Sequence, residues 1–134
     1  MQIGVIGAGS WGTTLANLLA KKGLNITLWA YEEELIRALA ATQENTLYLP
    51  GIKLSSRIVP TGSLKDVCQH KDLILIVTPS QVVRHIMQQI LPYLSPQQML
   101  INASKGIENK TLLTMSEVVR EVLRLNDYLE EAVQ

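Results

Sequence analysis

Cysteine is nearly absent from this chain, because Cys68 is the only one among 134 residues. A lone cysteine forms no internal disulfide, and its place in the polar stretch 66–71 indicates no catalytic role. No cysteine or histidine pair has the spacing of zinc ligands, so we expect no metal site. His70, in a charged turn, and His85, within a helix, are interpreted as surface or helix-face residues. These absences favour a reducing, cytoplasmic setting.

Net charge and long apolar runs are also missing. Twelve basic and twelve acidic side chains cancel, which argues against a broad nucleic-acid or membrane-surface footprint but leaves room for a local basic site. No apolar run reaches the roughly eighteen residues of a membrane span, and no signal peptide precedes the first apolar run. We therefore expect a cytoplasmic protein with small-molecule partners, no nucleic acid and no membrane.

Short apolar runs alternate with helical patterns along the chain. Such alternation predicts an α/β fold, namely a Rossmann-type, doubly wound and mostly parallel sheet. We expect one domain over residues 1–125, with 126–134 as a tail or shortened linker. The expected strands are 1–6, 25–29, 73–77 beside the first, and 99–103. The expected helices are one ending before Gly23, then 32–43, 63–69, one capped by Ser80 and running to Ile90, and one bearing Leu112, Met115, Val118, Val119 and Val122.

The stretch 44–62 is polar and rich in turn residues, with Pro50 and Pro60 preventing a long helix. We interpret it as a turn-rich stretch without a long helix.

Gly7, Gly9 and Gly12 form a G-x-G-x-x-G pattern between the first apolar run and the first helical pattern. In a dinucleotide-binding βαβ unit, the first glycine permits the tight turn and the second lets the backbone approach a pyrophosphate. The third lets the helix pack against the strand, and free N–H groups at the helix N-terminus face the phosphates. No Walker A sequence occurs. The pattern predicts a dinucleotide site; the alternative is an ordinary strand-to-helix turn.

Two charged residues follow expected strands. Lys105 comes after the strand 99–103, at the sheet edge where doubly wound folds bind ligands. Its charge can neutralise a substrate phosphate or polarise a ketone oxygen, unless it is a solvated surface lysine. Glu32 lies twenty residues after Gly12, the spacing at which a carboxylate binds the ribose 2′-hydroxyl. The alternative is that Glu32 only starts the next helix.

Further motifs accompany the glycine pattern. Residues 7–13 read GAGSWGT, Asn45 precedes YLPG at 48–51, residues 77–80 read VTPS, and residues 104–108 read SKGIE. Together they resemble the bacterial NAD(P)-dependent glycerol-3-phosphate dehydrogenases over nearly the whole chain. Beyond a turn that shapes a loop, the residues of the Asn45 motif indicate no mechanism.

The resemblance implies reversible reduction of dihydroxyacetone phosphate to glycerol 3-phosphate with NADH or NADPH, in the cytoplasm and in supply of phospholipid synthesis. It also implies a helical C-terminal domain that carries a second catalytic lysine and most of the substrate pocket. The resemblance ends near Leu123, so we expect either a shortened chain or a module that works with another chain. In either case we expect it to bind cofactor, to turn over poorly alone, and to be able to form a homodimer through the surface that the absent domain would cover.

The resemblance also implies roles for particular residues. Lys105 would contact both substrate and cofactor, while Ser10 and Trp11 occupy cofactor-contact positions through their backbone; Trp11 could instead be a packing residue. Many family members carry arginine or histidine at the positions of Tyr31 and Glu32, so we expect NAD to be preferred, with NADP possible. Pro79 with Ser80 forms a wall of the crevice or merely caps a helix. The predicted cofactor-binding residues are Gly7, Gly9, Ser10, Trp11, Gly12, Tyr31, Glu32, Pro79 and Lys105.

Two other functions fit the same fold. One is a stand-alone regulatory module that senses NAD, and the other is the cofactor domain of a different two-domain hydroxy-acid dehydrogenase. Lys105 favours an enzyme, because a sensor has no use for a cation aimed at a substrate carbonyl.

Overall fold

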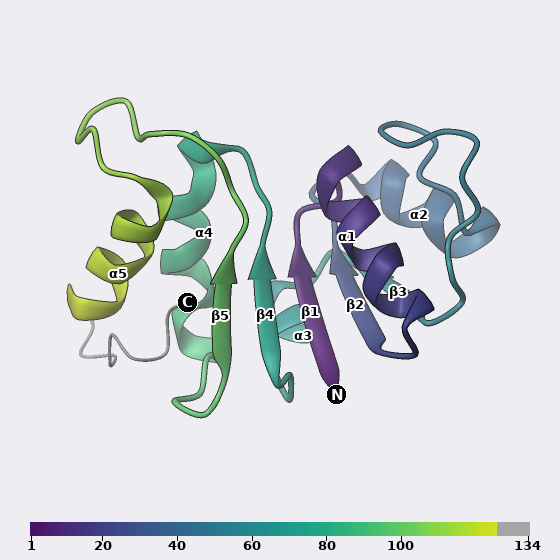
Figure 1. Ribbon diagram of the computed structural model, residues 1–134, viewed down its shortest axis with the longest axis horizontal. Helices are drawn as coiled ribbons and strands as arrows, with labels where there is room; N and C mark the ends of the chain where they lie inside the picture. Colours follow the sequence, from purple (N-terminus) through teal and green to yellow (C-terminus); the bar gives the residue numbers. More distant parts are fainter. Residues whose placement is uncertain (126–134) are drawn as a thin grey trace.

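Five short strands form one sheet at the centre of the computed structural model, which describes residues 1–125 (Figure 1). They are β1 (Gln2–Ile6), β2 (Asn25–Trp29), β3 (Ile58–Thr61), β4 (Leu73–Ile76) and β5 (Met99–Asn102). Their order is β3-β2-β1-β4-β5, and every pairing is parallel. The predicted doubly wound sheet is confirmed, and so is the pairing of 73–77 with the first strand, with Ile3 opposite Leu73.

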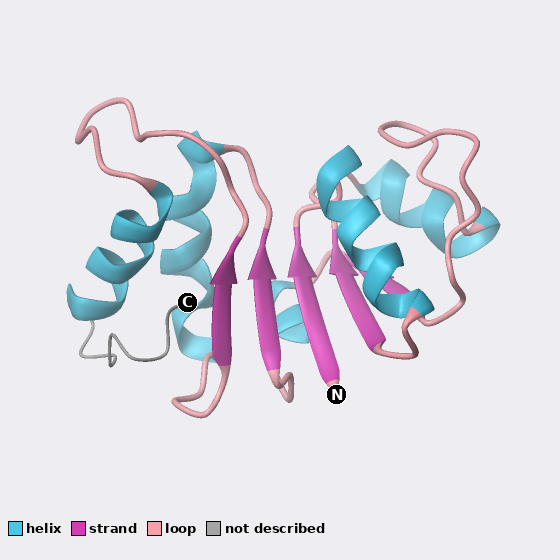
Figure 2. Cartoon of the chain, in the orientation of Figure 1, coloured by secondary structure: helices cyan, strands magenta, loops and turns pink. Residues whose placement is uncertain are grey.

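Helices cover both faces of this sheet, as Figure 2 shows. The α-helices are α1 (Ser10–Lys21), α2 (Glu33–Thr42), α3 (Leu64–Cys68), α4 (Val83–Ile90) and α5 (Met115–Leu125). Two single 3-10 turns, Ser80–Val82 and Leu91–Tyr93, flank α4. Because side chains alternate along a strand, Ile3 and Val5 pack with α1 and α2, whereas Ile6 packs with α3, α4 and α5. Each face therefore has its own apolar core.

Hydrogen bonds from side chains fix two of the helix starts. Ser63 accepts a bond from the Asp66 N–H and caps α3. Thr114 and Glu117 form a reciprocal pair at the start of α5, in which each side chain accepts from the other residue's N–H. This capping box sets the first turn of α5.

Two details of the predicted helices are wrong. Leu112 lies before α5, with φ of +60° and an exposed side chain, so it does not belong to the apolar helix face. Ser80 does not cap the following helix, because its hydroxyl instead accepts a hydrogen bond from the Gln81 side chain. A 3-10 turn intervenes, and α4 begins only at Val83.

The turn-rich stretch 44–62 contains a strand that the sequence pattern does not predict. Ile58–Thr61 forms β3 and pairs with β2, with Pro60 opposite Leu28. Proline lacks the N–H that a central strand would donate, yet it is tolerated at the edge of a sheet. The edge position of β3 explains why turn-type composition and a strand coexist here.

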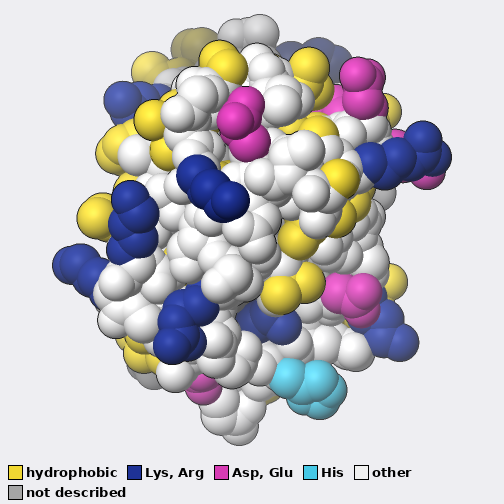
Figure 3. All heavy atoms as spheres, turned by 90° about the vertical axis from the view of Figure 1, so that its right-hand side faces the viewer, with side chains coloured by type: hydrophobic (Ala, Val, Ile, Leu, Met, Phe, Trp, Pro, Cys, Tyr) yellow, Lys and Arg dark blue, Asp and Glu magenta, His cyan; other side chains and the backbone are white. Residues whose placement is uncertain are grey.

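Charges of both signs share one face of the molecule, and the sole cysteine is buried. Figure 3 shows basic and acidic side chains on the same face, with apolar side chains between them. Burial raises the pKa of the Cys68 thiol to about 12, which makes it a poor nucleophile. Within residues 1–125, the helices are too short or too polar to cross a membrane. The predicted tail 126–134 lies outside the described residues.

Candidate functional site

Two connected cavities follow the carboxyl edge of the sheet. The first has a volume of about 780 Å³ and the second of about 310 Å³. They share four lining residues, Gly9, Val77, Thr78 and Pro79. After β1 the chain forms β2 and β3 on one side of that strand, and it then crosses to form β4 and β5 on the other side. The cleft thus lies at the topological switch point, where doubly wound sheets bind their ligands.

All nine predicted site residues line one of these cavities. Gly7, Gly9, Tyr31, Glu32 and Pro79 line the first. The second is lined by Gly9, Ser10, Trp11, Gly12, Pro79 and Lys105. Residues from the ends of β1, β2, β4 and β5 are therefore brought together as parallel strands require, although the sequence separates them by up to a hundred positions.

The three glycines of the turn differ in whether the protein leaves room for a side chain. A Cβ on Gly7 would lie 2.2 Å from the Val77 carbonyl oxygen, and one on Gly12 would lie 2.0 Å from the Gly7 carbonyl oxygen. These two glycines are required by the protein's own packing. A Cβ on Gly9 would meet nothing within 4 Å, so its absence leaves open space at the N-terminus of α1. This space suits a phosphate that approaches the backbone closely.

A second feature also suits a polar ligand. The Thr78 hydroxyl is the one buried side-chain oxygen in the described part of the chain without a hydrogen-bond partner. Thr78 lines both cavities. Buried polar groups in proteins are nearly always paired, so a group at the junction of the two cavities that lacks a partner fits a site completed by a bound molecule.

Lys105 and Trp11 lie together at the far end of the cleft. The Lys105 ammonium nitrogen lies 5.9 Å from the centre of the Trp11 ring, within the range of a cation–π interaction. Trp11 is half exposed, so it is not a core residue within this chain. Its ring supports the lysine beside the second cavity, which holds the positive charge near the glycine turn.

Asn45 ties a neighbouring loop to the glycine turn. Its amide nitrogen donates to the Ala8 carbonyl oxygen at 2.8 Å and to the Thr13 hydroxyl at 2.7 Å. Its side-chain oxygen accepts from the Tyr48 N–H at 2.9 Å. Asn45 is fully buried, and its bonds to Ala8 and Thr13 are buried with it. The motif that lacked a mechanism in the sequence therefore fixes the loop that carries Tyr48 over the first cavity.

Glu32 directs its carboxylate to the cleft and not to a helix. It is the residue before α2, as the alternative interpretation proposed, but its side chain makes no capping hydrogen bond. The carboxylate instead accepts a hydrogen bond from the Tyr48 hydroxyl, with 2.6 Å between the oxygens. The side chain is thereby held at the rim of the first cavity.

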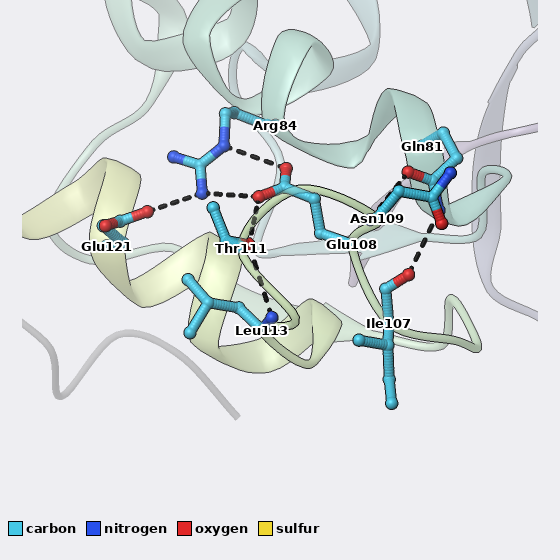
Figure 4. Close-up of polar contacts among 8 residues, drawn as sticks. All are labelled: Gln81, Arg84, Ile107, Glu108, Asn109, Thr111, Leu113 and Glu121. Atoms are coloured by element: carbon cyan, nitrogen blue, oxygen red, sulfur yellow. Dashed lines mark hydrogen bonds and ion pairs between the residues drawn. The ribbon is translucent and has the colours of Figure 1, made fainter.

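A polar network holds the loop that carries Lys105, as Figure 4 shows. The Arg84 guanidinium donates two hydrogen bonds to Glu108, each 2.9 Å long, and pairs with Glu121 on α5. The Thr111 hydroxyl also donates to Glu108. Gln81 accepts from the Asn109 N–H and donates to the Ile107 carbonyl oxygen. The loop between β5 and α5 is therefore fastened, through residues 107–109, to α4 and to the 3-10 turn before it.

Glu108→Gln is expected to lower the free energy of unfolding by about 2 kcal/mol at neutral pH, because charge-assisted bonds from Arg84 are lost. The Arg84 and Thr111 hydrogen bonds hold the pKa of Glu108 below its ordinary value. Its contribution is complete above the unfolded pKa and is lost as pH falls through the folded pKa. The difference from wild type should therefore shrink below about pH 4. Urea unfolding at neutral pH and at about pH 3 measures it.

Glu33→Gln is the matched control for this prediction. Glu33 pairs with Arg37, but both side chains are more than three-quarters exposed, whereas Glu108 is only 14% exposed. We expect a loss below about 0.5 kcal/mol. Equal losses in the two variants would mean that the loop network contributes no more than an exposed ion pair.

Sequence reasoning missed several residues of the first cavity. These include Trp29, Tyr48, Leu64, Thr78, Val82, His85, Ile86 and Gln89. His85 is exposed on a helix face as expected, but this face of α4 borders the cleft. The helical spacing of four of these residues indicates that they share one side of a helix, because residues three or four positions apart lie on the same face. They are Val82, His85, Ile86 and Gln89. Among residues 1–125, no three His, Cys, Asp or Glu side chains gather as a metal site would need.

The switch-point cleft, the glycine turn and the carboxylate after β2 define a Rossmann domain of the dinucleotide-binding class. The family model described as the NAD-dependent glycerol-3-phosphate dehydrogenase N-terminus matches residues 2–131. The chain belongs to this family.

Individual relatives agree with this assignment. A glycerol-3-phosphate dehydrogenase [NAD(P)+] of Geobacter metallireducens is 57% identical over 122 residues, which cover 91% of this chain and 36% of the relative. The crystal structure of glycerol-3-phosphate dehydrogenase from Coxiella burnetii is 32% identical with a TM-score of 0.85, over 91% of this chain and 37% of that one. The Saccharomyces cerevisiae enzyme is 29% identical with a TM-score of 0.82, over 91% and 39%. The chain thus spans little more than a third of the length of these relatives.

Proposed function

We propose that this chain binds NAD(H) in the cleft and forms the cofactor-binding part of an enzyme that interconverts dihydroxyacetone phosphate and glycerol 3-phosphate. The observation that carries the proposal is the open space at Gly9, which lines both cavities and so lies where the two halves of a dinucleotide would join. Family membership supports both the cofactor and the reaction.

In this proposal each part of the cofactor has its own set of residues in the cleft. The backbone of residues 9–12, at the N-terminus of α1, would hold the pyrophosphate. Tyr31, Glu32 and the α4 face would hold the adenosine in the first cavity. Trp11, Pro79 and Lys105 would border the nicotinamide half in the second cavity. When bound, the dinucleotide supplies or accepts the hydride.

Lys105 would act on the substrate. Reduction of a ketone places negative charge on its oxygen, and the phosphate of dihydroxyacetone phosphate is also anionic. A cation held at the end of the cleft stabilises either group without having to reorganise. Support by the Trp11 ring keeps the ammonium group at this position. The residues of the described chain thus provide electrostatic stabilisation, which is useful to an enzyme and of no use to a stand-alone NAD sensor.

The proposal also covers cofactor choice and location. The Glu32 carboxylate at the rim of the first cavity favours the ribose 2′-hydroxyl of NAD over the 2′-phosphate of NADP. The reaction would take place in the cytoplasm, where it supplies glycerol 3-phosphate for phospholipid synthesis.

Calorimetric titration of NADH into the folded chain tests the binding part of the proposal. We expect saturable one-to-one binding. A folded chain that binds no NADH would contradict it.

The reaction itself requires the rest of an enzyme. The 122 aligned residues can replace their counterparts in the Geobacter metallireducens relative. We expect this chimera to oxidise NADH with dihydroxyacetone phosphate, and the chain alone to do so poorly. A chimera that folds and binds NADH but does not oxidise it with dihydroxyacetone phosphate would contradict the proposed reaction.

A further inference from the structure

Tyr48 reaches the cofactor cleft from outside the predicted site. It lies in the loop between α2 and β3, and it lines the first cavity together with Glu32. Its hydroxyl donates to Glu32 Oε1 at 2.6 Å. The hydrogen bond and the negative charge of Glu32 raise the pKa of Tyr48, so at neutral pH the phenol is protonated and acts as the donor. The contact therefore joins the loop to the start of α2.

The backbone of Tyr48 is fixed independently of this hydroxyl. Its N–H donates to the buried Asn45 side chain, and the Leu49 N–H donates to the Asn45 carbonyl oxygen at 2.9 Å. Asn45 is in turn bonded to the glycine turn. Removal of the Tyr48 hydroxyl alone should therefore leave the loop in place. What it removes is the contact that holds the Glu32 carboxylate.

We propose that Tyr48 is a positioning residue for cofactor discrimination, whose hydroxyl holds the Glu32 carboxylate in place to accept a hydrogen bond from a ribose 2′-hydroxyl and to repel a 2′-phosphate. The proposal rests on the proposed function. The phenol occupies one carboxylate oxygen, and the other stays available to the ribose. A side chain that is already fixed loses less rotamer entropy when the ligand binds.

Holding the Glu32 carboxylate in place should favour NADH binding and disfavour NADPH binding. A held carboxylate keeps its hydrogen bond to a 2′-hydroxyl and keeps its negative charge close to a 2′-phosphate. A carboxylate released from Tyr48 would lose part of the first interaction and would rotate away from the phosphate. Loss of the hydroxyl should therefore weaken NADH binding and leave NADPH binding unchanged or tighter. A residue that merely holds the loop would change both affinities alike.

The test compares NADH and NADPH dissociation constants, measured by calorimetric titration, for the wild-type chain, Tyr48→Phe, Glu32→Gln and the double variant. For Tyr48→Phe we expect the preference for NADH over NADPH to fall about five-fold, the effect of one lost hydrogen bond. In the Glu32→Gln background the same change should leave the preference unaltered. Thermal unfolding of each variant provides the check that the loop is retained.

Different outcomes separate the two proposals. A wild-type chain that is folded but binds neither nucleotide overturns the proposed function and this inference with it. If the wild type binds NADH and Tyr48→Phe weakens both nucleotides equally, only the inference fails, because Tyr48 then acts through the loop. The inference also fails if the preference falls equally with and without the Glu32 carboxylate.

Discussion

Gly9→Ala is expected to weaken NADH binding by about 100-fold while the fold stays intact, because a methyl group would occupy the space that a phosphate needs. The added Cβ meets no protein atom within 4 Å, and φ and ψ of −70° and −174° are open to alanine. Alanine is a poorer residue than glycine before a helix, but it also restricts the unfolded chain. These two small effects oppose each other, so the unfolding temperature should barely change.

Gly12→Ala provides the contrast within the same turn. Its Cβ would lie 2.0 Å from the Gly7 carbonyl oxygen, and the backbone must move to relieve that clash. We expect a loss of at least about 3 kcal/mol in the free energy of unfolding, as for a severely overpacked core. Calorimetric titration together with urea unfolding distinguishes the two variants.

The opposite pattern would contradict this division of roles. If Gly9→Ala bound NADH normally, the glycine turn would be only a turn, and the open space at the N-terminus of α1 would not be the phosphate site. If Gly9→Ala instead unfolded, its glycine would be a packing requirement like Gly12. Only selective loss of binding supports the pyrophosphate position.

Local patterns in the sequence predict much of this fold because they report local physics. The apolar run 73–77 has the composition of a strand buried on both faces, and β4 is found there beside β1. Gly7 and Gly12 mark a tight turn and a close helix approach, and the structure has both. The nine predicted site residues line one cleft because parallel strands present their carboxyl ends at one edge.

Features set by distant contacts were not predictable in this way. β3 contains Pro60 and is a strand only because β2 offers it an edge. Asn45 resembles an ordinary turn residue until the fold brings it within 2.8 Å of the Ala8 carbonyl oxygen. Leu112 fits a helical spacing, but the capping box at Thr114 starts the helix after it. For β3 and Asn45, the partner that decides the structure lies far away in the sequence. For Leu112, a local capping box overrides the helical periodicity.

Lys105→Met is expected to lower kcat/KM for dihydroxyacetone phosphate by about 100- to 1000-fold in the chimera with the Geobacter metallireducens relative. Methionine keeps much of the length of the side chain and its contact with Trp11, but it removes the charge beside the second cavity. The charge matters most when the ketone oxygen becomes negative. NADH affinity of the chain should change by no more than about five-fold, because an exposed charge contributes little to binding.

Lys110→Met is the matched control, since Lys110 is an exposed lysine of the same loop that lines neither cavity. It should leave kcat/KM unchanged. Equal effects of the two substitutions would show that the loop's general positive charge attracts the substrate. Both losses in kcat/KM relative to wild type should then vanish at high salt. A large, salt-resistant loss confined to Lys105→Met is the result expected for a cation that stabilises developing charge at the reacting group. Such a cation touches that group directly, and salt screens a direct contact poorly.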